Sequence, residues 1–242
     1  MTGATGNVYV GLHEFEDMAF VLHFLRPDDL FADIGANVGS FTVLAGAGAG
    51  ARVIAFEPGI DAFYWLKQNI ALNDLFRLVE PRVQALGGRS GHVLFTSDLD
   101  TVNHVIPAKD KTIGEIRSVA MTTLDEALDA GCPSIIKIDV EGFETEVLRG
   151  AQETLPNPKL HCVVMELNGS SARYNFDETA LLEEMLRHGF EQYMYSPFDR
   201  RLEAKIPNGT ATAGNMIFVR DLPFVQQRLL EAKPFSVQGR KI

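Results

Sequence analysis

Short apolar stretches alternate with stretches of helical periodicity along most of the chain, and this alternation is the feature that most restricts its fold. The four strongest strand candidates are residues 30–34, 52–56, 134–140 and 160–167. Strands that alternate with helices form a parallel sheet, because each crossover helix returns the chain to the same end of the sheet. The sequence therefore predicts an α/β fold in which helices cover both faces of a mostly parallel sheet.

Helical periodicity marks the segments between these strands. Residues 13–26 are predicted to form an amphipathic helix that Pro27 ends, and residues 38–48 a second helix after the first strand. A later helix begins at its cap, Asp177, and ends at Gly189. These helices supply the layers that cover the sheet.

The rest of the chain gives weaker patterns. Shorter strands are predicted within residues 80–121, and two strands over residues 190–196 and 215–220 are spaced for a hairpin. The glycine-rich stretch 45–51 is interpreted as a frayed helix end and a loop. Because it does not directly follow a strand, it is not predicted to bind phosphate.

Length and continuity predict one domain over residues 1–242. A chain of 242 residues is long for an average domain but suits a single α/β domain. No linker and no internal repeat divides it. Within it we expect an N-terminal helical cap over residues 1–28, a core over 30–219 and a C-terminal tail over 220–242.

Composition restricts the partners and the compartment. Lys and Arg number 22 against 32 Asp and Glu, a net charge of −10 that disfavours a nucleic-acid partner. Two cysteines suit a reducing compartment. No signal peptide and no apolar run long enough for a membrane span is evident. The sequence predicts a cytoplasmic protein and leaves its oligomeric state open.

Each of the four strongest strand candidates ends in an acidic residue. These are Asp33, Glu57, Asp139 and Glu166. Ligands of an open parallel sheet bind outside the carboxyl ends of its strands, so adjacent strands would bring the four side chains to the rim of one crevice. Alternatively, each acid caps the next helix or pairs with a basic neighbour. The four together favour a binding site.

The turn after the first strand indicates a cationic ligand. Gly35 and Gly39 leave the dinucleotide pattern one glycine short, and Asp33 would repel a phosphate. S-adenosylmethionine carries an ammonium and a sulfonium group, and its carboxylate could bind amides near residues 37–40, Ser40 included. Glu57, at the end of the next strand, could accept both ribose hydroxyls.

Several segments resemble the FkbM family of S-adenosylmethionine-dependent methyltransferases. They are FADIGANVGSFTVLA, VIAFEP, TTLDEAL and IIKIDVEGFETEVLRGA, with KIDVEGFE the most specific piece. The resemblance covers residues 14 to about 219. It implies a Rossmann-like sheet of seven strands with an antiparallel C-terminal hairpin strand. It also implies O-methylation of a hydroxyl on a sugar, a glycoconjugate or a polyketide-like small molecule.

The resemblance also implies roles by position. The methionine part of the cofactor would be held by Asp33, Gly35, Asn37 and Gly39, the ribose by Glu57, the amino group by Glu14 and the adenine by Ala85. Glu16 is the alternative to Glu14.

Transfer of a methyl group to a hydroxyl needs a base or a metal beside the acceptor. Lys137 and Asp139 share one face of their strand and Glu141 follows in the loop, so these three are the catalytic candidates, with Asp139 or Glu141 as the base. Alternatively, Glu141 caps the following helix and Lys137 pairs with Asp139 or Glu166. A second alternative is a divalent metal, magnesium or calcium, on oxygen ligands of Asp139, Glu166 and Asn168.

Other segments give weaker functional signals. Acceptor specificity is assigned to residues 96–112 and 168–176, within which His104 is interpreted as a solvent-exposed loop residue. Of the adjacent aromatic residues Tyr64 and Trp65, at least one is expected to be packed.

Two other classes of function remain open. A nicotinamide-dependent oxidoreductase uses a similar sheet, but the missing glycine and the lack of a Tyr-x-x-x-Lys pair count against it. A non-catalytic methyltransferase-like binding module would keep the fold alone. The intact DIGANVG segment, Glu57 and Asp139 argue against that reading.

Overall fold

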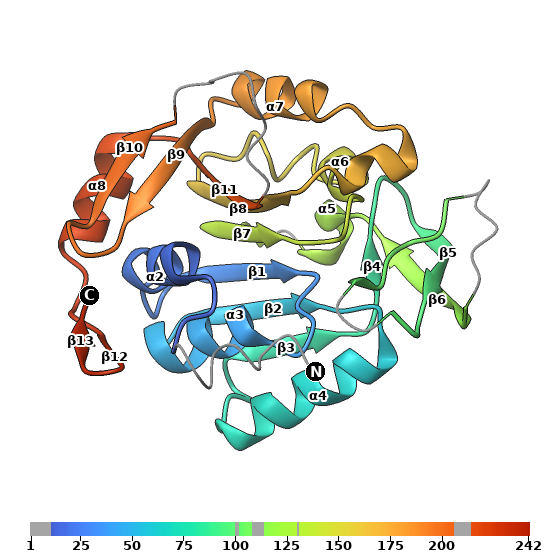
Figure 1. The fold of residues 1–242 in the computed structure, drawn as a ribbon, viewed down its shortest axis with the longest axis horizontal. Coiled ribbons are helices and arrows are strands. Elements are labelled where there is room, and N and C mark those ends of the chain that lie inside the picture. Colours follow the sequence, from blue (N-terminus) through green and yellow to red (C-terminus); the bar gives the residue numbers. More distant parts are fainter. Residues whose placement is uncertain (1–10, 100–101, 108–113, 130, 206–213) are drawn as a thin grey trace.

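An eight-stranded sheet forms the centre of the molecule (Figure 1). The structure is a computed structural model that describes residues 11–99, 102–107, 114–129, 131–205 and 214–242. The spatial order of the strands is β10-β9-β11-β8-β7-β1-β2-β3. Their bounds are β1 Leu30–Ile34, β2 Arg52–Phe56, β3 Val79–Arg82, β7 Ile135–Ile138, β8 Cys162–Leu167, β9 Glu191–Ser196, β10 Arg201–Ala204 and β11 Gly214–Val219.

The strand directions confirm the predicted fold class. Neighbouring strands from β3 to β8 are parallel, and β11 lies antiparallel between β8 and β9. An eighth strand, β10, pairs antiparallel with β9 at the edge. Sequence analysis did not predict it, because its residues are largely exposed and carry no apolar alternation. An edge strand buries too little surface to leave such a signal.

Helices cover both faces of the sheet, as predicted. The face that includes Phe31 packs against α2 (Phe15–Phe24), α4 (Ile60–Leu72) and α8 (Leu222–Leu230). The face that includes Ala32 packs against α5 (Leu124–Ala127), α6 (Glu144–Arg149) and α7 (Glu178–Arg187). Successive strand residues point to opposite faces, so each strand supplies both cores.

Local capping explains where two helices start. The Thr123 hydroxyl accepts a hydrogen bond from the Glu126 amide at 3.1 Å, and the Asp177 carboxylate accepts one from the Thr179 amide at 2.8 Å. These contacts satisfy amide groups that the first helical turn leaves without partners. The predicted cap at Asp177 is therefore confirmed.

Two predictions about the first helices are wrong. Residues 18–24 of α2 are all buried, so this helix is enclosed rather than amphipathic. The stretch predicted to fray follows α3 (Ser40–Val43) as an ordered π-helix, Leu44–Ala49. A Cβ atom on Gly48 would lie 2.6 Å from Leu22 Cδ2 of α2. Gly48 thus allows close packing against α2.

The central segment forms a small second sheet beside the main one. Its strands are β4 Ala85–Leu86, β6 Ile116–Thr122 and β5 Gly91–Thr96, in that order. The parallel strands of the main sheet point toward it (Figure 1). It therefore lies at the edge where the acidic strand ends gather. The strands predicted within residues 80–121 correspond to β3, β4, β5 and β6.

The terminal segments pack onto this core. In the tail, a short hairpin of β12 (Ser236–Val237) and β13 (Arg240–Lys241) follows α8. Residues 1–10 of the predicted N-terminal cap lie outside the described residues. The division of one domain into cap, core and tail stays a prediction. None of the helices in the described part of the chain is long and apolar enough to cross a bilayer.

Candidate active site

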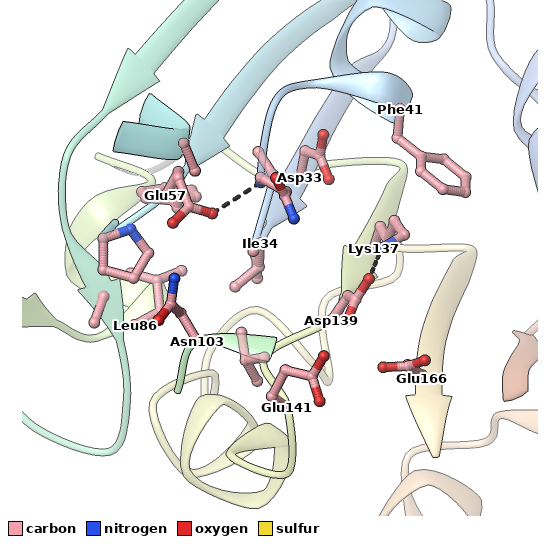
Figure 2. Close-up of a pocket in the computed structure, with 18 of the residues that line it drawn as sticks. Asp33, Ile34, Phe41, Glu57, Leu86, Asn103, Lys137, Asp139, Glu141 and Glu166 are labelled. Carbon is pink, nitrogen blue, oxygen red and sulfur yellow. Dashed lines mark hydrogen bonds and ion pairs between the residues drawn. The ribbon is translucent and has the colours of Figure 1, made fainter. Parts of the chain in front are cut away.

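A cavity opens at the carboxyl ends of β1, β2, β7 and β8 (Figure 2). The volume of the cavity is about 270 Å³. Most of the predicted site residues line this cavity: Glu14, Asp33, Gly35, Asn37, Ser40, Glu57, Ala85, Lys137, Asp139, Glu141 and Glu166. Gly39 and Asn168 do not line it. Residues that lie up to 152 positions apart in the sequence thus meet at one edge of the sheet, because parallel strands end there together.

Asp33 is the most deeply buried acid of the cavity. Its side chain is 1% exposed, and its Oδ2 accepts a hydrogen bond from the Thr42 hydroxyl at 2.5 Å. Within the described part of the chain, nothing donates a hydrogen bond to its Oδ1. Burial raises the pKa of Asp33, and Lys137 on the neighbouring strand opposes that shift. A buried acceptor without a partner is costly, so Oδ1 is suited to a ligand that donates.

Glu57 is held by backbone amides. Its Oε2 accepts from the Asn37 amide at 2.8 Å and its Oε1 from the Gly59 amide at 2.7 Å. Burial raises the pKa of Glu57 to about 7. Each oxygen keeps one lone pair for a further donor, which allows two adjacent hydroxyls of a ligand to bind.

The two glycines of the turn have conformational roles. Gly35 has a φ of +79°, and a Cβ atom there would lie 1.8 Å from the Asp139 carbonyl oxygen. Gly39 has a φ of +91°, and a Cβ atom there would lie 2.5 Å from Leu66 Cδ1. Only glycine fits such positions without strain. Gly39 therefore shapes the turn from outside the cavity wall.

The buried Lys137 forms an ion pair with the half-buried Asp139. The Lys137 Nζ atom lies 2.6 Å from Asp139 Oδ2 and 4.7 Å from the centre of the Phe41 ring. Burial acts to lower the pKa of Lys137, but the carboxylates of Asp139 and Asp33 outweigh it and raise the pKa. Burial likewise acts to raise the pKa of Asp139, and Lys137 holds it below its ordinary value. Asp139 is therefore kept ionised.

Asp139 lies in a cluster with two further carboxylates, those of Glu141 and Glu166. One oxygen of each lies within 4.8 Å of the others. Burial and the neighbouring Asp139 raise the pKa values of both glutamates. These three acids could hold a metal ion, and Asn168 acts to lower the pKa of Glu141. The metal alternative that includes Asn168 stays a prediction.

Glu144 holds the loop that carries Glu141, a role the sequence analysis missed. Its Oε1 accepts hydrogen bonds from the amides of Gly142 at 3.0 Å and Val140 at 3.3 Å. Burial raises the pKa of Glu144 to about 7. Glu141 itself has a φ of +54°, a conformation that costs about 1–2 kcal/mol for a residue with a side chain.

The structure bears on the two parts of the non-catalytic alternative for Glu141 and Lys137. Phe143 occupies the cap position of α6, where no side chain caps the helix, so Glu141 is not its cap. Lys137 does pair with Asp139, as the alternative stated.

Glu14 is fixed by a residue from the other end of the chain. The Asn215 amide nitrogen donates to Glu14 Oε2 and, at 3.2 Å, to Asp17 Oδ2. Glu14 lines the cavity, whereas its alternative Glu16 is exposed and does not. Burial raises the pKa of Asp17 to about 6.

The cavity wall beside β4 is mostly apolar, with Gln84 and Asn103 as polar members. Its wall includes Ala85 and Leu86 from β4, Phe95 from β5, Val105 and Phe143. The Tyr174 hydroxyl donates to the Val105 carbonyl oxygen at 2.6 Å and so ties residues 102–107 to residues 170–174. Apart from Ala85, which the family resemblance implied, these wall residues left no sequence signal beyond ordinary core patterning.

Two smaller predictions near the cavity are wrong. His104 is 7% exposed, and its Nδ1 lies 2.9 Å from the Val102 carbonyl oxygen, so it is no solvent-exposed loop residue. Trp65 and Tyr64 are 51% and 55% exposed, so neither belongs to the core, and their rings contact each other. Leu66 and Ile70 instead supply the core face of α4.

Comparisons with known proteins identify the family. The family model described as the methyltransferase FkbM domain matches residues 33–191. The hexuronic acid methyltransferase AglP of Haloferax volcanii is 27% identical over 155 residues, which cover 64% of this chain and 62% of that protein. Methyltransferase sdnD of Sordaria araneosa is 26% identical over 172 residues, which cover 57% of this chain and 66% of that protein. The chain thus spans less than two thirds of the length of either relative.

A solved structure shares the fold. The methyltransferase FkbM from Methylobacillus flagellatus KT aligns with a TM-score of 0.54 at 14% identity, over 81% of this chain and 44% of that one. The matched family segment begins at Asp33 and extends past Glu166, so it includes the acidic ends of all four strands. The chain belongs to the FkbM methyltransferase domain family.

Proposed function

We propose that the chain is an S-adenosylmethionine-dependent O-methyltransferase that acts on a hydroxyl of a sugar, a glycoconjugate or a polyketide-like small molecule. The observation that carries the proposal is the orphan acceptor of the cavity, Asp33 Oδ1, which is buried and lacks a partner among the described residues. An ammonium group satisfies such an oxygen, whereas a phosphate would be repelled by it. Family membership points to the same class of donor.

We propose one orientation for the donor in the cavity. Asp33 and Glu14 would take the amino group, the turn of Gly35, Asn37, Gly39 and Ser40 the methionine part, Glu57 the ribose hydroxyls, and Ala85 would contact the adenine. The support is chemical, since polar groups stand near Asp33 and apolar side chains stand near Ala85.

The residues of the chain would supply positioning and proton transfer. The bound donor provides a methyl group on a positively charged sulfur. Asp139 or Glu141 would accept the proton of the acceptor hydroxyl, and Lys137 would keep Asp139 ionised for this task. The walls of the cavity would exclude water and hold the two reactants in line.

The nature of the acceptor is supported by a relative and by charge. The relative from Haloferax volcanii is a hexuronic acid methyltransferase, which favours a sugar-like acceptor here. The net charge of −10 disfavours a nucleic acid. A divalent metal on Asp139, Glu141 and Glu166 remains the alternative to a carboxylate base.

Calorimetric titration and a labelled-methyl assay test the proposal together. S-adenosylhomocysteine should bind while the nicotinamide dinucleotide should not, and label should pass to an acceptor from a mixture of glycans and polyketides. Tight binding of the dinucleotide alone would overturn the proposal in favour of an oxidoreductase. Binding of S-adenosylhomocysteine without turnover of any acceptor would favour a binding module.

Asp139→Asn and a chelator separate the two modes of proton removal. If Asp139 is the base, Asp139→Asn should lower kcat far more than donor affinity, and the chelator should have no effect. If a metal acts instead, the chelator should abolish turnover by the wild-type protein.

A further inference from the structure

Asn215 joins the start of α2 to the edge of the main sheet where the cavity opens. It is the second residue of β11, and in the antiparallel ladder it lies opposite Glu166 of β8. Residues paired in this way point to the same face of a sheet, so the two side chains are neighbours. Glu166 lines the cavity (Figure 2), whereas Asn215 does not. Asn215 therefore lies next to the cavity without forming its surface.

The amide group of Asn215 is directed at two acids. Its nitrogen donates to Glu14 Oε2 and, at 3.2 Å, to Asp17 Oδ2. Its Oδ1 is buried and has no partner within the described part of the chain. A buried acceptor without a partner is costly. The reverse orientation of the amide would bring this oxygen against two carboxylates, so the donor contacts determine how the side chain lies.

The Glu14 carboxylate depends on this contact for its position. Among the described residues, Asn215 is the one that donates a hydrogen bond to it. Glu14 stands before α2 with a φ of −100° and a ψ of 79°, outside helical geometry, and its side chain does not cap the helix. Asp17 adds a second negative charge beside it, and like charges repel. Without the amide to hold both acids, Glu14 would turn away from Asp17.

Glu14 acts on the part of the cavity that contains Asp33. Burial acts to lower the pKa of Lys137, and the carboxylates of Asp139, Asp33 and Glu14 together outweigh it. Glu14 is therefore near the strand ends that carry Lys137 and Asp33. Asp33 Oδ1 is a buried acceptor without a partner among the described residues. The proposed function assigns the amino group of the donor to these two acids.

We infer that Asn215 is a positioning residue for recognition of the donor's amino group, because it holds the Glu14 carboxylate in place to accept from that group. Asn215 acts through Glu14, which lies 201 positions away in the sequence, and does not touch the donor. This inference rests on the proposed function and adds a residue to its donor site.

Two ligands that differ in one group test this inference. They are S-adenosylhomocysteine and its desamino analogue, in which a hydrogen atom replaces the α-amino group. Calorimetry gives the Kd of each ligand, and the ratio of the two Kd values measures recognition of the amino group. The wild type should prefer S-adenosylhomocysteine roughly 100-fold, since two acids accept from the charged group. Asn215→Ala should lower this preference to about tenfold and leave the Kd of the analogue unchanged.

Further variants assign the effect to Glu14. Glu14→Gln should lower the preference by a similar factor. The double variant Glu14→Gln with Asn215→Ala should lower it no further, because residues that act as a unit are not additive. Glu183→Gln, which removes an exposed charge from α7, should leave the preference unchanged.

Gln226→Ala is the matched control for the loss of an amide side chain. Gln226 donates to the Arg200 carbonyl oxygen at 2.7 Å and accepts from the Leu202 amide at 3.0 Å. It thus ties α8 to β10 as Asn215 ties α2 to β11, but it does so away from the cavity. The variant should leave the preference unchanged even where it lowers stability.

Asn215→Asp is a second variant, nearly equal in size to the wild-type side chain, whose carboxylate cannot donate to either acid. It should lower the preference as Asn215→Ala does. An unchanged preference in both variants, or equal weakening of both ligands, would make the contact purely structural and would overturn the inference. Loss of analogue binding in both variants would do the same, as would an additive loss in the double variant.

Binding to the wild type keeps the two levels of the argument apart. If the wild type does not bind S-adenosylhomocysteine, the proposed function fails and the inference fails with it. If the wild type binds both ligands equally well, the donor assignment stands and the inference is overturned.

Discussion

At the scale of single residues, the site depends on acids whose surroundings set their charge. Asp139 is ionised because Lys137 contacts it, whereas Glu57 and Glu166 have raised pKa values because burial dominates. Environments that push carboxyl pKa values apart are the usual basis for distinct roles in one site. The sequence revealed these residues because each ends an apolar run, but it could not reveal how they are paired.

The ribose assignment predicts a specific loss of affinity in Glu57→Gln. The amide keeps one acceptor oxygen but turns the other into a donor, so the two backbone amides and two ligand hydroxyls cannot all be satisfied. We expect about a 10- to 100-fold weaker affinity for S-adenosylhomocysteine, the cost of one hydrogen bond to a charged group. Calorimetry measures it, and Glu183→Gln is the control. Wild-type affinity in Glu57→Gln would remove Glu57 from the site.

The turn predicts that Gly35→Ala is severely destabilising. The added Cβ atom would meet the Asp139 carbonyl oxygen at 1.8 Å and would also hold a positive φ. Gly169→Ala is the matched control, since Gly169 has a φ of +81° with nothing within 4 Å of the added atom. Urea unfolding should show a loss of about 1 kcal/mol in Gly169→Ala and about 3 kcal/mol or more in Gly35→Ala. Equal losses would mean that the contact with Asp139 is unimportant.

At the scale of elements, the buried strands were predicted from the sequence more accurately than the exposed or irregular elements. The four central strands are buried on both faces and have continuous apolar runs, so residues 30–34 and 52–56 were predicted with their observed bounds. The edge strand β10 and the π-helix were missed because neither has its own periodic pattern. Glu144 was missed because its partners are backbone amides of a loop, which no residue pattern records.

We expect the stability of the folded state to depend on pH through Glu144, which holds the loop before α6. Its raised pKa, about 7 against an ordinary 4.5, means that the folded state holds a proton that the unfolded state releases. The stability that this proton contributes is complete below about pH 4.5 and is lost as the pH rises to about 7. Glu144→Gln keeps an acceptor for both amides but has no proton to lose.

Urea unfolding at pH 5 and pH 8 measures this effect. Wild-type stability should fall between the two values by about 2 kcal/mol more than that of Glu144→Gln. Glu183→Gln should behave as the wild type does. An identical fall in Glu144→Gln would show that the carboxyl of Glu144 does not titrate as described.

At the scale of the whole molecule, the cavity links distant parts of the chain. Its walls come from the N-terminal segment, four strands of the main sheet, the small sheet and the loop before α6. The residues of the main sheet could be predicted, since parallel strands end together. Residues 96–112 were expected at the acceptor, but the individual wall residues Phe95, Asn103 and Val105 could not be predicted, because no local rule places the small sheet beside the large one.

Because the cavity joins distant parts of the chain, we expect S-adenosylhomocysteine to stabilise the whole folded state. At a concentration of S-adenosylhomocysteine 100-fold above its Kd, the folded state should gain about 2.7 kcal/mol and the Tm should rise by roughly 5–10 °C. Asp33→Asn should lose most of the rise at the same concentration. Thermal unfolding followed by circular dichroism measures it, with the nicotinamide dinucleotide as the control ligand. An equal rise with the dinucleotide would contradict the assigned donor.

The contact between Gly35 and the Asp139 carbonyl has a consequence for how such a scaffold can diversify. Because the turn after β1 touches the end of β7 backbone to backbone, neither can shift without the other, and side-chain exchange cannot loosen them. We expect new acceptors to be accommodated elsewhere, in residues 102–107 and 170–174, which the Tyr174 hydroxyl joins. We expect descendants of one ancestral enzyme to keep the residues proposed to bind the donor almost unchanged. Their sequences should differ in the segments that carry Tyr174 and Val105.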